Sequence, residues 1–323
     1  MSDLVEVVKL KKHFPIRGGV FSRQVNVIHA VDDVSFNIKR GEVFGLVGES
    51  GCGKTTTSKC ILRLIESTSG IIRWKGQNIL ELDEEKFRGI RLKMQMVFQD
   101  PYSSLNPTMS VKDIIGEGLG VYGLKDRDEK REEIFKLLER MELSPSYIFR
   151  YPHELSGGEK QRIGIARALA VKPEFIVADE PVAALDSSVK AKIINLLMDL
   201  KEDFRLTFMF VSHDLSVVKH VSHRLGVMYA GKLVELGMVK KLYDNPQHPY
   251  TQALLSAIPI PNPTLKQKRI LLKGDVPSLV NPPPGCRFHT RCEYAKPICS
   301  KEEPKLIEIE KDYFVACHQD KIS

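Results

Sequence analysis

Residues 42–56 of the chain read EVFGLVGESGCGKTT, and this stretch decides the fold. An apolar run typical of a buried strand ends at a glycine-rich turn, and the segment after the turn has the pattern of a helix. Turn and helix start fit G-x-x-x-x-G-K-[ST], which in this strand, loop and helix context predicts a phosphate-binding loop. Glycines let backbone N–H groups curl around a polyphosphate, and the helix N-terminus adds a positive dipole. The sequence therefore predicts a nucleotide site.

Each residue of this loop is expected to help bind the nucleotide. Lys54 is expected to reach the β and γ phosphates, and Thr55 to ligate Mg²⁺. We also expect a reactive thiol at Cys52, because a helix N-terminus and a nearby lysine both lower a thiol pKa. The predicted ATP-binding residues of the loop are Gly48, Glu49, Ser50, Gly51, Cys52, Gly53, Lys54, Thr55 and Thr56.

A second apolar segment, FIVADE at residues 175–180, predicts a buried strand with two acids at its C-terminal end. Ligands of open α/β sheets bind at that end of the strands. Asp179 is therefore predicted to hold Mg²⁺, and Glu180 to polarise the attacking water as a general base.

The segment ELSGGEKQR places Ser156 and Glu159 at the S-x-x-E spacing of a capping box before a helix. Gly157 and Gly158 between them leave backbone amides open, so this helix N-terminus is a second anion-binding position. The chain then has two phosphate-binding positions but only one loop that carries a lysine. We infer that each nucleotide is shared between two chains.

Strands alternate with helices along most of the chain. GIIRWKGQNI (70–79) predicts a hairpin, DEKREEIFKLLERMEL (128–143) an amphipathic helix, and LTFMFVSHD (206–214) a buried strand. This alternation predicts an α/β core with a largely parallel sheet. A chain of 323 residues exceeds the usual size of one core, and its composition becomes proline-rich after about residue 255. We therefore predict two domains, residues 1–255 and 256–323.

The chain carries a formal net charge of +7 at pH 7. This charge suits an anionic partner such as nucleotide, nucleic acid or lipid headgroups, and an ordinary solvated surface explains it equally well. No stretch approaches the roughly 18 apolar residues of a membrane span. We therefore expect a protein that is made and kept in the cytosol.

These motifs resemble those of the ATP-binding cassette (ABC) family. GESGCGKTT resembles the Walker A motif, LSGGEKQR the signature and FIVADE the Walker B motif. MVFQDP resembles the Q-loop, AALD the D-loop and FVSHD the segment of the switch histidine, and order and intervals match over residues 1 to about 255. The resemblance implies a RecA-like α/β core with an N-terminal antiparallel β subdomain and an α-helical subdomain at about residues 100–160.

The resemblance also assigns roles to single residues. In that family two cassettes close head to tail, and ATP lies between the Walker A motif of one and the signature of the other, here Ser156, Gly157, Gly158 and Glu159. It implies that Gln99 contacts Mg²⁺ and senses the membrane partner, and that His213 contacts the γ-phosphate. Catalysis is then assigned to Glu180, His213 and Lys54.

At two positions the match between this sequence and the family's motifs is weaker. Phe14 lies where the family has an aromatic residue that stacks on adenine, with Phe21 as a competing candidate. The D-loop ends at Asp186, but Ala183 stands where family members commonly have serine. The missing hydroxyl puts in doubt one contact across the dimer, not the ATPase chemistry.

Four of the six cysteines follow residue 285. A cytosolic location argues against disulfides, and four thiolates suit tetrahedral zinc or an iron–sulfur cluster, with free thiols as a third possibility. NPQHPYTQALLSAIP, PPPGCRFHTRC and ACH are similar to the tail of dipeptide and oligopeptide importer ATPases, which implies a [4Fe–4S] cluster. For zinc, His289 and His318 are the alternative ligands. The four cysteines are Cys286, Cys292, Cys299 and Cys317.

The function that the resemblance implies is ATP hydrolysis, with Mg²⁺, that powers peptide uptake through two separate membrane permease subunits. An identical or sister cassette, and indirectly an extracytoplasmic peptide-binding protein, are the other expected partners, and no nucleic acid is expected. The chain is expected at the cytoplasmic face of the membrane as a peripheral protein, soluble when isolated. A cassette ATPase of ribosomes or nucleic acid and a redox or metal sensor are the alternatives. The sequence does not choose among dipeptides, longer peptides and nickel chelates as substrate.

Overall fold

The computed structural model describes residues 2–18, 23–123, 126–183, 185–258 and 269–319. Its contacts divide the chain into two compact units. One unit consists of Met1–Leu80 together with Val211–Ser323, and the other of Glu81–Phe210. The domain division at residue 255 that the composition indicates stays a prediction.

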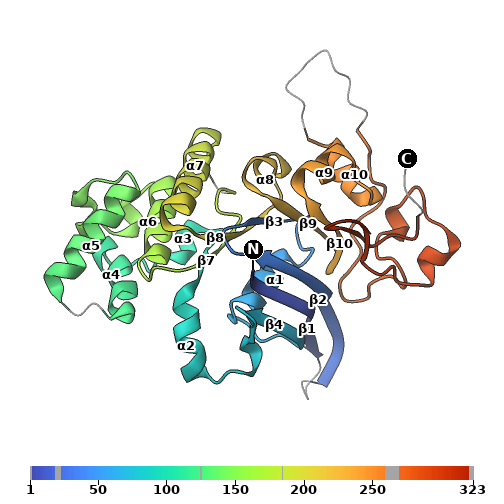
Figure 1. Ribbon diagram of the computed structural model, residues 1–323, viewed down its shortest axis with the longest axis horizontal. Coiled ribbons are helices and arrows are strands. Elements are labelled where there is room, and N and C mark those ends of the chain that lie inside the picture. The colour runs from blue at the N-terminus through green and yellow to red at the C-terminus, as the bar shows by residue number, and fades with distance from the viewer. Residues whose placement is uncertain (1, 19–22, 124–125, 184, 259–268, 320–323) are drawn as a thin grey trace, which may run out of the picture. The chain divides into compact units, whose positions relative to one another are not determined.

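The first unit contains an antiparallel sheet with the strand order β2-β1-β4-β5 (Figure 1). The long strands β1 (Asp3–Gly18) and β2 (Arg23–Lys39) form its main pair. Strand β4 (Ser69–Trp74) pairs with β1 and with β5 (Gln77–Asn78). The predicted hairpin and the predicted antiparallel β subdomain are both confirmed.

A second sheet in this unit carries the phosphate loop. Its strand order within the unit is β11-β12-β10-β9-β3. Strands β3 and β9 run parallel, and the other neighbours run antiparallel. Every residue of β3 is buried, which fits its apolar sequence. The bounds are β3 (Val43–Val47), β9 (Arg224–Tyr229), β10 (Lys232–Met238), β11 (Ile307–Glu310) and β12 (Tyr313–Val315).

The helices of the first unit are short, and α1 (Lys54–Ile61) directly follows the phosphate loop. The others are α8 (Leu215–Val221), α9 (Val239–Asp244), α10 (Pro249–Ser256), and the 3-10 turns η4 (His289–Arg291) and η5 (Pro297–Ser300); η1 (Ile79–Glu81) lies where the chain enters the second unit.

The second unit combines parallel strands with most of the long helices. Strands β6 (Met94–Val97) and β7 (Phe175–Asp179) pair in parallel, and β8 (Thr207–Ser212) neighbours β7. The helices are α2 (Glu84–Lys93), α3 (Pro101–Ser104), α4 (Val111–Tyr122), α5 (Arg127–Arg140), α6 (Gly157–Leu169) and α7 (Ser187–Phe204), with the 3-10 turns η2 (Pro145–Phe149) and η3 (Pro152–Glu154).

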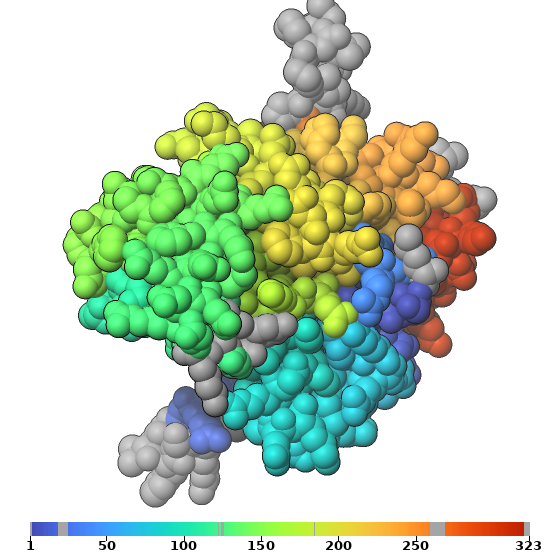
Figure 2. Space-filling view, turned by 60° about the vertical axis from the view of Figure 1, so that its left-hand side comes forward, coloured from blue at the N-terminus to red at the C-terminus, as the bar shows by residue number. Residues whose placement is uncertain are grey.

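Helices α4, α5 and α6 contact one another, and they form much of the green surface in Figure 2. Helix α5 begins at the N-cap Asp126, whose side chain accepts hydrogen bonds from two backbone N–H groups. Its residues Ile134, Leu137 and Leu138 are buried at helical spacing, so the predicted amphipathic helix is confirmed. In the described part of the chain, none of the helices has the length and apolar content needed to span a bilayer.

Candidate functional site

The phosphate loop lies between β3 and α1, as the sequence predicts (Figure 1). Gly53 is the N-cap of α1 and has a φ of 106°, a left-handed conformation that suits glycine. A Cβ atom at Gly53 would lie 2.2 Å from the carbonyl oxygen of Ala30, and one at Gly48 would lie 2.2 Å from that of Met228. Both glycines are therefore required by the close packing of the loop against neighbouring strands.

The side chain of Lys54 is turned into the loop. Lys54 is 4% exposed, and its Nζ donates hydrogen bonds to the carbonyl oxygens of Gly48 (2.8 Å) and Glu49 (3.0 Å). The loop's own backbone thus holds the ammonium group where a polyphosphate bound by the loop amides would meet it. Thr55 follows in the first turn of α1, and its role as a Mg²⁺ ligand stays a prediction.

The expectation of a reactive thiol at Cys52 is wrong. Cys52 is 1% exposed. Burial raises the pKa of its thiol more than the neighbouring Lys54 lowers it. The helix N-terminus and the lysine are present as predicted, but the pattern of residues does not reveal that the sulfur is shielded from solvent.

We therefore expect Cys52 to resist a maleimide in the folded protein. Its labelling should be slower by at least about a hundredfold than in the same protein unfolded in guanidinium, because a buried protonated thiol reacts only when the loop opens. Peptide mapping by mass spectrometry measures the two rates. Labelling of Cys52 in the folded protein at the rate of the unfolded chain would contradict its burial.

Asp179 and Glu180 lie at the C-terminal end of β7, as predicted. Asp179 is 2% exposed, whereas Glu180 is half-buried with a φ of 46°. A left-handed φ costs a residue with a side chain about 1–2 kcal/mol, and such strain collects at functional sites. The amide Nε2 of Gln99 donates a hydrogen bond of 3.0 Å to Oε2 of Glu180. The sequence predicts all three residues in the site but not this bond, which orients the carboxylate of Glu180.

The signature helix α6 begins as the sequence predicts. Ser156 is the N-cap, and its backbone N–H donates to the Glu159 carboxylate over 2.7 Å while its side chain accepts from the backbone N–H of Glu159. Tyr147 also donates a hydrogen bond to Glu159, and this bond is the main cause of the lowered pKa of that carboxyl. A Cβ at Gly158 would lie 2.7 Å from a methyl group of Val189, so a glycine is needed there. The capping box is confirmed.

Three further predicted residues are at least partly accessible. His213 is exposed and directly follows β8. Asp186 is the exposed N-cap of α7, and its side chain makes no capping hydrogen bond. Phe14 is half-buried on β1, with Nζ of Lys12 4.7 Å from its ring centroid, so it is not a core residue. The roles of these residues stay predictions. Phe21 lies outside the described residues.

The residues predicted for the nucleotide site belong to both units. The phosphate loop, Phe14 and His213 belong to the first unit. The second unit contains the Walker B acids, Gln99, the signature and Asp186. The residues of the first unit have the chemistry to hold phosphates. Those of the second unit include the carboxylates and a second helix N-terminus.

Residues 285–319, which carry the four C-terminal cysteines, form a segment that we call the cysteine module. Its four cysteines are free thiols, and all except the buried Cys299 are half-buried. Burial, together with the charges of the other three cysteines, raises the pKa of Cys286 to about 11. Burial is also the main cause of the raised pKa values of Cys292 and Cys317, and the charge of Cys299 contributes to both. The fold thus brings the four thiols close enough for their charges to interact.

Backbone N–H groups are directed at every sulfur of the module. Lys296 donates to Sγ of Cys299 over 3.4 Å. Phe288, Tyr294 and Gln319 donate to Cys286, Cys292 and Cys317, and these bonds lower the respective thiol pKa values against the effect of burial. Such donors stabilise thiolates, which are the form that binds a metal. The donor set therefore fits a metal centre.

The spacing of the sulfur atoms bears on which metal fits. Tetrahedral zinc, with Zn–S bonds of about 2.3 Å, needs sulfurs about 3.8 Å apart. Among the residues that the structure describes, no three of these sulfurs lie within 4.8 Å of one another. His289 and His318, the alternative zinc ligands, each have a ring nitrogen hydrogen-bonded to a backbone carbonyl, of Cys286 (2.7 Å) and Glu302 (2.8 Å).

Two family models match the chain. Residues 31–183 match the model described as "ABC transporter", and residues 234–299 match "Oligopeptide/dipeptide transporter, C-terminal region". The first match covers the Walker A, Q-loop, signature and Walker B segments, and the second extends into the cysteine module.

Individual relatives agree with these matches. The "Oligopeptide transport ATP-binding protein AppF" of Bacillus subtilis is 53% identical over 98% of this chain and 97% of its own length. The "Probable peptide ABC transporter ATP-binding protein y4tS" of Sinorhizobium fredii is 48% identical over 98% of this chain and 90% of its own. Among solved structures, a dimeric post-hydrolysis state of the ATP-binding cassette MJ0796 bound to ADP and Pi aligns with a TM-score of 0.65 and 31% identity, covering 73% of this chain and 98% of that one.

Proposed function

The chain belongs to the ABC transporter family, in its branch of oligopeptide and dipeptide transport ATP-binding proteins, and is an ATPase; from this premise we propose that it powers the uptake of dipeptides or oligopeptides. The relative from Bacillus subtilis, whose name states oligopeptide transport and which matches over nearly its full length, is the observation that carries the proposal. The match of residues 234–299 to the C-terminal region of such transporters supports it.

The proposed partners follow from the family. Two separate permease subunits form the membrane path, and this chain binds them at the cytoplasmic face. A second cassette, identical or a sister, completes the ATP sites, because the signature of one chain serves the nucleotide held by the other. An extracytoplasmic binding protein delivers the peptide. No nucleic-acid partner belongs to this proposal.

The residues of the site have distinct roles in the proposed mechanism. The amides of the phosphate loop and the Nζ of Lys54 hold the β and γ phosphates. Mg²⁺, held by Thr55, Asp179 and Gln99, would neutralise phosphate charge when bound. Glu180 accepts a proton from the attacking water, and the hydrogen bond from Gln99 orients its carboxylate for this task.

Three further parts of the chain contact the nucleotide in this proposal, and His213 is the one that acts on the γ-phosphate. His213 donates a hydrogen bond to the γ-phosphate from its exposed position after β8. The N-terminus of α6 presents its dipole to the nucleotide of the partner chain. Phe14, which is half-buried on β1, stacks on the adenine ring.

The peptide assignment is tested in membrane vesicles that contain this chain, its partner cassette and the permeases. A labelled dipeptide or oligopeptide, supplied with its binding protein, should accumulate and raise the ATPase rate several-fold, because transport and hydrolysis are coupled. Vesicles with the variant Lys54→Ala are the matched control and should do neither. Uptake of a nickel chelate without uptake of any peptide would replace the proposed substrate.

We also propose that the cysteine module holds a [4Fe–4S] cluster. Four free thiols from one segment and four backbone N–H donors directed at their sulfurs support this proposal. The cluster would supply a covalent link among four cysteines that are spread over 32 positions of the chain.

A further inference from the structure

Two arginines of the cysteine module extend out of it toward the nucleotide cassette. Arg287 follows Cys286 and Arg291 precedes Cys292, and their side chains are only 7% and 8% exposed. A buried guanidinium is rarely found without a partner, because loss of its hydration has to be offset by specific hydrogen bonds. The partners of these two arginines belong to the cassette, not to the module.

Arg291 binds a side chain of the phosphate loop itself. Its Nη1 lies 2.8 Å from Oε2 of Glu49, and its Nη2 lies 3.4 Å from Oε1, so the guanidinium faces the carboxylate with both nitrogens. The backbone N–H of Glu49 donates to the hydroxyl of Tyr250 over 2.8 Å. The second residue of the loop is therefore held at its side chain by the cysteine module and at its backbone by α10.

A cluster of three aromatic rings lies beside the ion pair of Arg291 and Glu49. The ring centroids of Tyr229 and Tyr250 lie 4.6 Å apart, and that of Phe288 lies 5.2 Å and 5.5 Å from them. All three rings are almost fully buried. Arg291 Nη1 also donates to the hydroxyl of Tyr229 over 3.4 Å. Phe288 thus joins the cysteine module to the two tyrosines that contact Arg291 and Glu49.

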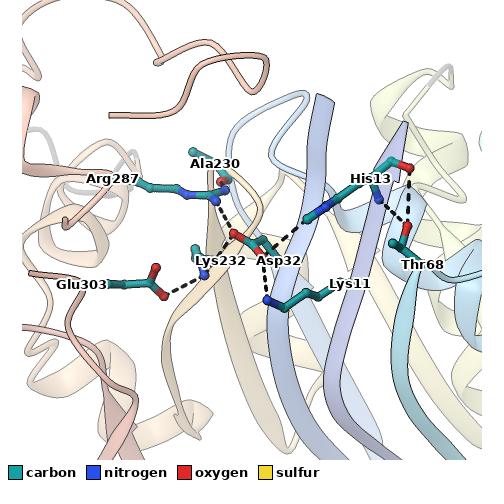
Figure 3. A network of polar contacts seen from close by, with 8 residues as sticks. All are labelled: Lys11, His13, Asp32, Thr68, Ala230, Lys232, Arg287 and Glu303. Carbon is teal, nitrogen blue, oxygen red and sulfur yellow. Dashed lines mark hydrogen bonds and ion pairs between the residues drawn. The ribbon is translucent and has the colours of Figure 1, made fainter. Parts of the chain in front are cut away.

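Arg287 anchors the other end of the module (Figure 3). It donates hydrogen bonds to the carbonyl oxygen of Ala230 and to the carboxylate of Asp32 on β2. Asp32 also forms ion pairs with Lys232 at 3.2 Å and Lys11 at 3.6 Å. Burial raises its pKa, but the three cations outweigh burial and hold it at about 2. The module is therefore attached to the cassette by an ion-pair network that persists at neutral pH.

The same network argues against a metal ion near Asp32. Ligand atoms of His13, His29 and Asp32 lie within 4.8 Å of one another, a spacing that suits a metal. Three cationic side chains already surround the carboxylate, and a further cation would have to displace them. We assign this cluster to attachment of the module.

We propose that Arg291 is a positioning residue of the phosphate loop. Through Arg291, the presence or loss of metal in the cysteine module sets the affinity of the loop for ATP. This inference rests on the proposed ATPase function. The carboxylate of Glu49 belongs to a loop that receives a polyanion, and without its partner it would repel the phosphates. Arg291 neutralises that charge and fixes the side chain. Because η4 contains Arg291 and ends directly before Cys292, metal loss at the module would loosen the arginine.

The first test compares steady-state ATP kinetics of three single variants. Arg291→Ala should raise KM for ATP about tenfold and change kcat less than about twofold, because the lost contact aids binding and not the chemical step. Arg291→Lys, which keeps the charge, should recover part of the loss. Arg73→Ala is the matched control: it removes another arginine–glutamate pair of the same unit, also 2.8 Å long, and should leave KM unchanged. An unchanged KM in Arg291→Ala would overturn the proposal.

A double-mutant cycle separates charge neutralisation from simple loss of packing. If Arg291 acts on Glu49, the substitution Arg291→Ala should change KM less than twofold when it is made in the Glu49→Gln background. An equal, tenfold rise in both backgrounds would show that Arg291 only supports the fold. Circular dichroism and thermal unfolding of each variant identify any that fails to fold, and Arg291→Lys then serves for the comparison.

The link to the cysteine module has its own test. Cys292→Ser should raise KM for ATP in the wild-type background and add little in the Arg291→Ala background, because both act through one contact. Additive effects would overturn the coupling. Wild-type protein that hydrolyses no ATP would instead contradict the proposed function, so the two failures are distinguishable.

Discussion

Replacing Glu180 by glutamine should lower the rate of ATP hydrolysis by about a thousandfold while ATP still binds. The amide keeps the shape of the carboxylate but cannot accept the proton of the attacking water. Because the Gln99 amide already donates to Oε2 of Glu180, the substituted oxygen can still be held in the same place. The trapped species should be an ATP-bound dimer, seen as a shift in size-exclusion elution with MgATP.

Glu174→Gln is the matched control for this experiment. Glu174 directly precedes β7, at the opposite end of the strand from Glu180, so the same chemical change is made away from the phosphates. Its rate should stay within about twofold of the wild type. A Glu180→Gln variant that retains more than about a tenth of the wild-type rate would remove Glu180 from the role of general base.

Replacing any one of the four module cysteines by serine should remove most of the iron from the protein. Purified without oxygen, the wild type should be brown and contain iron and acid-labile sulfide in about equal amounts, near four of each per chain. The variant should be nearly colourless and more sensitive to protease after about residue 285, because the module has little core without its cluster. ATP should still bind, with the weaker affinity expected for a loosened Arg291.

Cys60→Ser provides the control for this loss. Cys60 is a fully buried cysteine of α1, outside the module, so its substitution tests whether any change of a thiol lowers the iron content. Iron and sulfide in this variant should match the wild type. Colourless anaerobic protein with stoichiometric zinc and no labile sulfide would contradict the cluster, and a metal-free module that resists protease would contradict any metal.

Features that depend on short-range patterns could be predicted from the sequence. The phosphate loop, the strand that ends at Asp179, the capping box at Ser156 and the helix around Leu137 each depend on residues a few positions apart. Their geometry follows from backbone rules that hold in any fold. The structure confirms these elements for that reason.

What the sequence did not predict depends on contacts between distant residues. Glu49 and Arg291 are 242 positions apart, and neither has a neighbouring pattern that points to the other. The orientation of Glu180 by Gln99 spans 81 positions. Burial of Cys52 likewise depends on the strands around the loop, so the helix dipole and Lys54 alone gave the wrong direction for its pKa.

Strand β10 pairs with β9 along one of its edges and with β12 along the other. Without β12, the second edge of β10 would be unpaired. During synthesis, β10 is complete at residue 238, whereas β12 begins at Tyr313. A growing chain of intermediate length therefore displays an unpaired edge made of mostly buried residues, the type of edge that recruits strands from other molecules. Slow or interrupted translation after β10 would expose the protein to aggregation, and chaperone demand should be greatest in that interval.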